Sequence, residues 1–245
     1  MWYWIRIAGR QEEAAMISRR SLLCGAGCGC LAISSPFAAL PAFAKGKPKR
    51  GIKPEKALEL LKEGNAAFVQ GACTTGAPGR IHELADGRAP FAVIIACSDS
   101  RTPPNALFNR GLGDLFIIRV AGNTVDSSGL GSIEYGISVL GTSLVLVLGH
   151  THCGVVNAAV KAVTEKAKFP GSIGTIVAPI IPAVRSLKGG DDLAERAVTA
   201  NVQRVVSRLK AAKPIVTKGL QDGSVKVAGA VYDIATGKVD FGVAA

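Results

Sequence analysis

Aromatic residues make up only 5% of this 245-residue sequence. The net charge of +11 could indicate a nucleic acid partner, because clustered lysine and arginine attract phosphates. Proteins that bind single strands also stack bases on aromatic rings, and no basic run here is interleaved with aromatic residues. We therefore expect no nucleic acid partner.

The sequence also lacks long apolar runs and a high cysteine content. No uninterrupted apolar run reaches the roughly 18 residues that a membrane-spanning helix needs, which excludes a polytopic membrane protein. Six cysteines are too few for a disulfide scaffold of this length. The length and the 48% apolar content fit one large domain or, less often, two small ones.

The first 44 residues have the pattern of an export signal. Arg19 and Arg20 precede a small-residue and apolar run from Leu22 to Leu40, and an A-x-A cleavage pattern ends at Ala44. This order is typical of a secretory signal, and the paired arginines favour twin-arginine export. We predict a targeting segment at 1–44, export to the periplasm or a similar compartment, and no stable membrane insertion after cleavage.

A buried or membrane-anchored N-terminal helix is the alternative for this segment, although glycine, serine and proline interrupt it. Residues 1–15 do not fit a signal peptide, whereas Met16 would begin one of ordinary length. We therefore expect translation to start at Met16. Cleavage would remove the clustered Cys24, Cys28 and Cys30, so they are not a metal motif of the folded domain.

Residues 45–53 form a basic linker, and residues 54–245 alternate between helical and strand patterns. Continuous apolar runs predict buried strands at 91–96, 115–120 and 144–148, and a hairpin is predicted from 225–232 and 238–243. Helices are predicted at 54–68, 81–85, 129–140 and 153–166, and after Asp191 or Asp192, whereas 173–187 is ambiguous because prolines interrupt it. The pattern indicates a single α/β domain with a mainly parallel central sheet flanked by helices, an N-terminal helical arm and a C-terminal β-hairpin.

Metal-binding side chains follow two of these strands directly. Cys97 follows the strand 91–96, and His150 and Cys153 follow the strand 144–148. Ligands gather at the carboxyl ends of strands in an open parallel sheet, so these residues could meet. Two thiolates and an imidazole suit Zn²⁺, and three protein ligands leave a position for water, as in catalytic zinc sites. We predict one zinc ion per chain.

Three alternatives stay open at this point. Each cysteine alone is more often a small buried apolar residue than a ligand. His152 could replace His150, although His150 ends the strand and stands three residues before Cys153. Cys97 and Cys153 could also form a disulfide, because the compartment of an exported protein is oxidising.

Asp99 and Arg101 stand just after Cys97 in the segment C-S-D-S-R. The carboxylate of Asp99 could close the fourth metal position or accept a hydrogen bond from the metal's water. Arg101 could pair with it, keep it ionised and hold it away from the cation. Zinc would lower the pKa of bound water from ~15.7 towards ~7, although two thiolates work against that lowering.

These motifs resemble the β-class carbonic anhydrases, in which C-x-D-x-R is followed later in the chain by H-x-x-C. Similar segments occur in the same order, namely F-I-I-R-V-A-G-N at 116–123, S-I-E-Y-G at 132–136 and G-A-V-Y-D at 229–233. The resemblance extends over most of the chain from Pro54 to the C-terminus.

The resemblance implies zinc on Cys97, His150 and Cys153, with Asp99 and Arg101 as the catalytic pair. Asp99 would be a fourth ligand only in a closed state of the site. It further implies reversible hydration of carbon dioxide to bicarbonate and a proton, and a homodimer or tetramer.

Two more residues are expected at the substrate. Gly154 could present a backbone N–H to a substrate oxygen, because helix N-termini favour developing anions. Many family members carry a glutamine in a G-Q-x-P segment, where it helps bind substrate from a neighbouring subunit. This chain has Arg88 in the segment G-R-A-P, which could still donate hydrogen bonds but adds a charge.

Other functions fit parts of the pattern. A hydrolase of carbonyl sulfide or carbon disulfide on the same zinc scaffold would use identical ligands. A non-catalytic zinc-binding scaffold protein would not need the pair of Asp99 and Arg101. A thiol–disulfide protein could use Cys97 and Cys153, but no C-x-x-C pair supports it.

Overall fold

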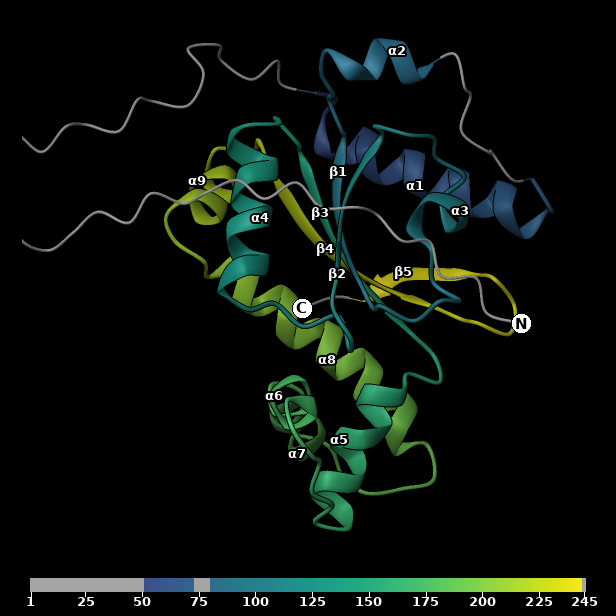
Figure 1. Ribbon diagram of the computed structural model, residues 1–245, viewed down its shortest axis with the longest axis vertical. Helices are drawn as coiled ribbons and strands as arrows, with labels where there is room; N and C mark the ends of the chain where they lie inside the picture. The colour runs from purple at the N-terminus through teal and green to yellow at the C-terminus, as the bar shows by residue number, and fades with distance from the viewer. Residues whose placement is uncertain (1–50, 73–79, 244–245) are drawn as a thin grey trace, which may run out of the picture. The chain divides into compact units, whose positions relative to one another are not determined.

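A computed structural model describes residues 51–72 and 80–243 of the chain (Figure 1). The predicted targeting segment 1–44, with the expected start at Met16, and the linker up to residue 50 lie outside the described residues. Within the described part, no helix combines the length and apolar character needed to cross a membrane.

A five-stranded sheet forms the centre of the domain, in the strand order β2-β1-β3-β4-β5. The first four strands in that order are parallel, and β5 runs antiparallel to β4. The mainly parallel sheet and the C-terminal hairpin are therefore confirmed. The strands are β1 (Ala92–Ala96), β2 (Leu115–Arg119), β3 (Leu144–His150), β4 (Lys226–Tyr232) and β5 (Val239–Val243).

Helices surround this sheet, and the five predicted ones are present with bounds that differ by a few residues. The helices of the described residues are α1 (Pro54–Val69), α2 (Arg80–Ala85), α3 (Pro104–Leu107), α4 (Ser127–Ser138), α5 (Gly154–Thr164), α6 (Ile173–Val177), α7 (Ile181–Arg185), α8 (Leu193–Lys210) and α9 (Ile215–Gln221).

Short helices account for the differences from the sequence prediction. α3 and α9 were not predicted, because four and seven residues are too few to show a helical period. The ambiguous segment 173–187 forms α6 and α7, with Pro182 in the first turn of α7, where a missing N–H costs nothing. Asp192 precedes α8 but does not cap it with its side chain, which pairs instead with Arg196 at 2.9 Å.

Successive side chains along each strand point to opposite faces of the sheet, so the hydrophobic core is divided between the two faces. Val93, Ile95, Val145 and Val147 pack on one face against residues of α4, α8 and α9. The alternate strand residues pack on the other face against α1 and α3. Figure 1 shows these two helix groups on opposite sides of the strands. This two-sided burial explains why the strands read as continuous apolar runs.

A third apolar cluster lies beyond the carboxyl ends of the strands. It is built from α5, α6, α7 and the first part of α8, and it includes the side chains of Cys97 and Cys153. The two cysteines are thus enclosed by apolar residues such as Val156 and Ile180. This largely apolar surrounding lowers the local dielectric constant and strengthens the electrostatic interactions between the two thiols.

Candidate metal centre

Parallel pairing brings the three predicted ligands together. Ala96 at the end of β1 pairs with Leu148 of β3, so Cys97 lies beside the carboxyl end of β3, where His150 is the last residue. Cys153 follows in the turn and is the N-cap residue of α5. One ligand atom from each residue lies within 4.8 Å of the other two, and all three side chains are buried.

The orientation of His150 fits a metal ion. Its Nδ1 lies 2.8 Å from the carbonyl oxygen of Thr151, which assigns the ring proton to Nδ1. Nε2 is then an acceptor, and it is buried without a hydrogen-bond partner. An unpaired buried acceptor beside two sulfurs is costly unless a cation occupies the space between them. The donor set therefore fits Zn²⁺.

The pKa values of the two cysteines and the histidine are also shifted by their mutual contacts. The interaction with the Cys153 thiol lowers the pKa of Cys97, although burial acts in the opposite direction. The same interaction raises the pKa of Cys153. Burial lowers the pKa of His150, but its contacts with Cys97 and the Thr151 carbonyl outweigh this effect and raise that pKa overall. A divalent cation would replace the protons that these groups share.

The alternatives left open by the sequence can now be compared with the geometry. Cys97 and Cys153 are free thiols rather than a disulfide. His152 is exposed, has a left-handed backbone with φ 55°, and is not part of the ligand group. It lines a hollow of about 390 Å³ together with Cys153, Asp191, Asp192 and other residues, but its ring is not among the grouped ligand atoms. His150 is thus the histidine that the fold brings to the cysteines.

Asp99 and Arg101 form a bidentate pair next to the ligand group. The Arg101 Nε donates to Oδ1 of Asp99 at 2.9 Å and Nη2 donates to Oδ2 at 2.7 Å. The backbone N–H of Arg101 donates to the same Oδ1 at 2.9 Å. The Arg101 guanidinium holds the pKa of Asp99 well below its usual range. Asp99 is held by Arg101 in this structure and does not belong to the buried ligand group.

Residues that sequence reasoning missed hold the loop after β1. Arg119, the last residue of β2, donates through Nε to the carbonyl of Cys97 at 2.9 Å and through Nη2 to the carbonyl of Asp99. Thr102 donates its hydroxyl to the carbonyl of Asp99 at 2.9 Å. The N–H of Gly122 donates to Sγ of Cys97 at 3.3 Å. Arg119 and Gly122 lie in the segment 116–123 that resembles the family, but only the pairing of Ala96 with Arg119 in the structure shows that this arginine reaches the loop.

The two predicted substrate residues lie in different parts of the fold. Gly154 is the first residue of α5, directly after Cys153, and is exposed. Arg88 is exposed and precedes β1, so it lies towards the amino end of the strand whose carboxyl end leads to Cys97. Within one chain Arg88 does not lie at the ligand group. It could therefore act in substrate binding only at the ligand group of a second subunit.

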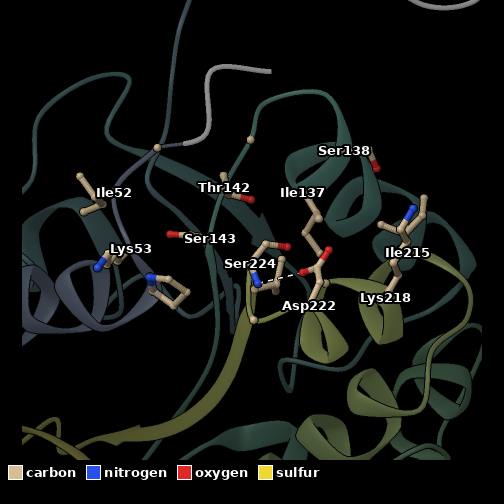
Figure 2. A pocket seen from close by; sticks show the side chains of 16 residues that line it. Ile52, Lys53, Ile137, Ser138, Thr142, Ser143, Ile215, Lys218, Asp222 and Ser224 are labelled. Carbon is tan, nitrogen blue, oxygen red and sulfur yellow. Dashed lines mark hydrogen bonds between the residues drawn. The ribbon is translucent and has the colours of Figure 1, made fainter. Parts of the chain in front are cut away.

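A larger hollow lies at the amino edge of the sheet, away from the ligand group. It has a volume of about 460 Å³ and is lined by the start of α1, the end of α4, the segment just before β3, α9 and the turn between α9 and β4. Figure 2 shows Thr142 and Ser143 between Lys53 on one side and Lys218 on the other, with Asp222 bonded to the backbone N–H of Ser224. Neither cysteine nor histidine lines this hollow.

The site lies at the carboxyl edge of a parallel sheet and combines two thiols, one imidazole and a nearby carboxylate. This combination is typical of the class of α/β enzymes with catalytic zinc. Comparisons with known proteins narrow this class. The family model described as carbonic anhydrase matches residues 92–239. Carbonic anhydrase 2 of Mycobacterium tuberculosis is 36% identical over 192 residues, which cover 76% of this chain and 91% of that protein.

Solved structures agree with this match. The β-carbonic anhydrase CafA of Aspergillus fumigatus aligns with a TM-score of 0.61 and 28% identity, covering 78% of this chain and 91% of that one. A tetrameric β-carbonic anhydrase of Sordaria macrospora aligns with a TM-score of 0.60 and 22% identity, covering 76% and 94%, and supports the fold. The chain belongs to the carbonic anhydrase family, in its β class.

Proposed function

We propose that this protein is a zinc-dependent carbonic anhydrase that reversibly hydrates carbon dioxide to bicarbonate and a proton. The buried group of Cys97, His150 and Cys153 beside the pair of Asp99 and Arg101 carries this conclusion. Membership of the family supports it independently. Metal analysis combined with a stopped-flow assay of carbon dioxide hydration tests it, with one zinc per chain and measurable hydration expected.

Each site residue then has a distinct task. Cys97, His150 and Cys153 would hold the ion, and zinc would supply, when bound, the Lewis acidity that lowers the pKa of water towards about 7. Asp99 accepts a hydrogen bond from the nucleophilic water and orients it, because Oδ2 receives only one of the hydrogen bonds from Arg101. Arg101 keeps that carboxylate ionised through the two hydrogen bonds it donates, and would hold it back from a bound cation.

We propose that Gly154 and Arg88 assist the substrate. The N–H groups at the start of α5 would stabilise charge that develops on the substrate oxygen. Arg88 would contribute to the site of a neighbouring subunit, because within one chain it lies before β1, at the opposite end of that strand from Cys97. Asp99 would reach the metal as a fourth ligand only if Arg101 released it.

An oligomer, either a dimer or a tetramer, follows from the same proposal. β2 is an edge strand whose residues Leu115 to Ile118 are only half-buried, and the large apolar side chains of Leu112 and Tyr135 are exposed. An open edge with apolar surface favours association with another chain. Light scattering after gel filtration should give at least a dimer, and a monomer at working concentration would contradict this proposal.

We also propose export by the twin-arginine route. This route accepts folded cargo, and zinc bound in the cytoplasm would occupy Cys97 and Cys153 before an oxidising compartment could pair them. Replacing Arg19 and Arg20 with lysine should keep the protein in the cytoplasm on cell fractionation. Undiminished periplasmic enzyme in that variant would contradict the route but not the zinc site.

A further inference from the structure

One buried amide connects a distant helix to the ligand group. Asn201 lies on the apolar face of α8 among Ala197, Val198, Val202 and Val205, and only 1% of it is exposed. An asparagine buried in such a place costs free energy unless its amide makes hydrogen bonds. Nδ2 of Asn201 donates to the carbonyl oxygen of Gly122 at 3.0 Å. The polar side chain is therefore directed at one peptide group of the loop after β2.

Gly122 continues this connection to the metal ligand. Its own N–H donates to Sγ of Cys97, so the residue receives a hydrogen bond from α8 and gives one to the sulfur. Its backbone has φ +77°, and an added Cβ would lie 2.7 Å from Cδ1 of Ile180 and 3.2 Å from Cγ1 of Val155. Glycine is required here by both the backbone conformation and the close packing.

We propose that Asn201 is a positioning residue for the metal centre. The carbonyl and the N–H of Gly122 belong to the two peptide groups on either side of its Cα, which a glycine lets rotate freely. By holding the carbonyl, Asn201 limits that rotation so that the Gly122 N–H stays directed at the Cys97 sulfur. A backbone N–H that donates to a thiolate stabilises its negative charge, and partners of this kind orient metal ligands and raise affinity. This inference rests on the proposed role of Cys97 as a zinc ligand.

The chain offers a matched control for a merely structural role. Asn65 on α1 is also buried and donates to the carbonyls of Leu107 at 3.2 Å and Gly237 at 3.0 Å. It accepts a hydrogen bond from the N–H of Val239 at 2.9 Å. None of these partners contacts a predicted zinc ligand through a hydrogen bond that the structure describes. Loss of Asn65 should therefore reduce stability without changing the metal site.

The experiment compares Asn201→Leu and Asn65→Leu in the full chain. Zinc affinity is measured by competition with a chelator, and the sulfur-to-metal charge-transfer absorption is recorded after substitution of Co²⁺ for zinc. Asn201→Leu should bind zinc about tenfold more weakly and shift the Co²⁺ absorption band. Asn65→Leu should lower the melting temperature at least as much, yet keep wild-type zinc affinity and the wild-type band.

Two results would overturn the inference while leaving the zinc site in place. One is wild-type affinity and an unshifted band in Asn201→Leu, and the other is an equal loss of zinc affinity in both variants. If Asn201→Leu does not fold, Asn201→Ala provides the same comparison, because it also lacks the donor. Absence of zinc binding by the wild-type protein would instead refute the ligand assignment itself, and the inference with it.

Discussion

The two edges of the sheet differ in what converges on them. The amino edge has the larger hollow, about 460 Å³, but its charged lining groups are Lys53, Lys218 and Asp222, and no soft donors lie among them. The carboxyl edge gathers two sulfurs and one imidazole nitrogen within 4.8 Å. The size of a hollow thus says little about chemistry here. The carboxyl ends of parallel strands lie at the same edge of the sheet, and residues that directly follow those strands are therefore brought together into the metal site.

The largest expected effect comes from a ligand at the carboxyl edge. Cys153→Ser leaves only two strong ligands, so zinc affinity should fall by more than about 100-fold and hydration activity should be nearly lost. Zinc content after dialysis and stopped-flow hydration measure both quantities. Ser143→Ala at the amino edge is the control and should retain zinc and activity. Full zinc occupancy in Cys153→Ser would remove Cys153 from the ligand set.

Asp99→Ala should separate metal binding from catalysis. The carboxylate is held by Arg101 rather than by the ligand group, so the variant should keep its zinc. Hydration should fall by about 100- to 10,000-fold, the range typical of a lost proton-handling group. The measurement is kcat together with zinc content on the same preparation. Loss of zinc together with activity would show that Asp99 is a true fourth ligand.

Arg101→Ala should change how stability depends on pH. The pair lowers the pKa of Asp99, so its stabilising effect is complete above the ordinary carboxyl pKa of about 3.9. That effect disappears as pH falls through the lowered pKa of the folded state. Urea unfolding of both proteins between about pH 2 and 6 should show a small wild-type advantage that is largest above about pH 4 and shrinks towards pH 2, and it stays small because Arg101 is half exposed. An advantage that grows as the pH falls would contradict this explanation.

The smallest effect is expected at the amino edge. The hydroxyl of Thr142 is buried without a hydrogen-bond partner, so Thr142→Val removes a polar atom that contributes no bond among the described residues. The free energy of unfolding should stay equal or rise by less than about 1 kcal/mol, and kcat/KM should not change. Thermal unfolding and the hydration assay measure this. A large loss of activity would show that the two edges are coupled.

Much of the fold and the ligand group was predictable because both depend on local patterns. Continuous apolar runs marked β1 and β3, and Cys97 and His150 stood directly at their ends. The supporting contacts were not predictable, because Asn201 lies 79 residues from Gly122 and only the packing of α8 brings them together. The region around α6 and α7 was ambiguous because two short helices interrupted by proline have no clear period.

The central claim is that the buried group at the carboxyl edge holds a zinc ion on which carbon dioxide hydration depends. The most direct measurement is hydration activity of the purified full chain against zinc content, first as isolated, then after a chelator removes the metal, and again after zinc is restored. We expect about one zinc per chain and a hydration activity that falls and recovers in proportion to the zinc content. Full activity in zinc-free protein, or stoichiometric zinc that persists in Cys97→Ser, would contradict it.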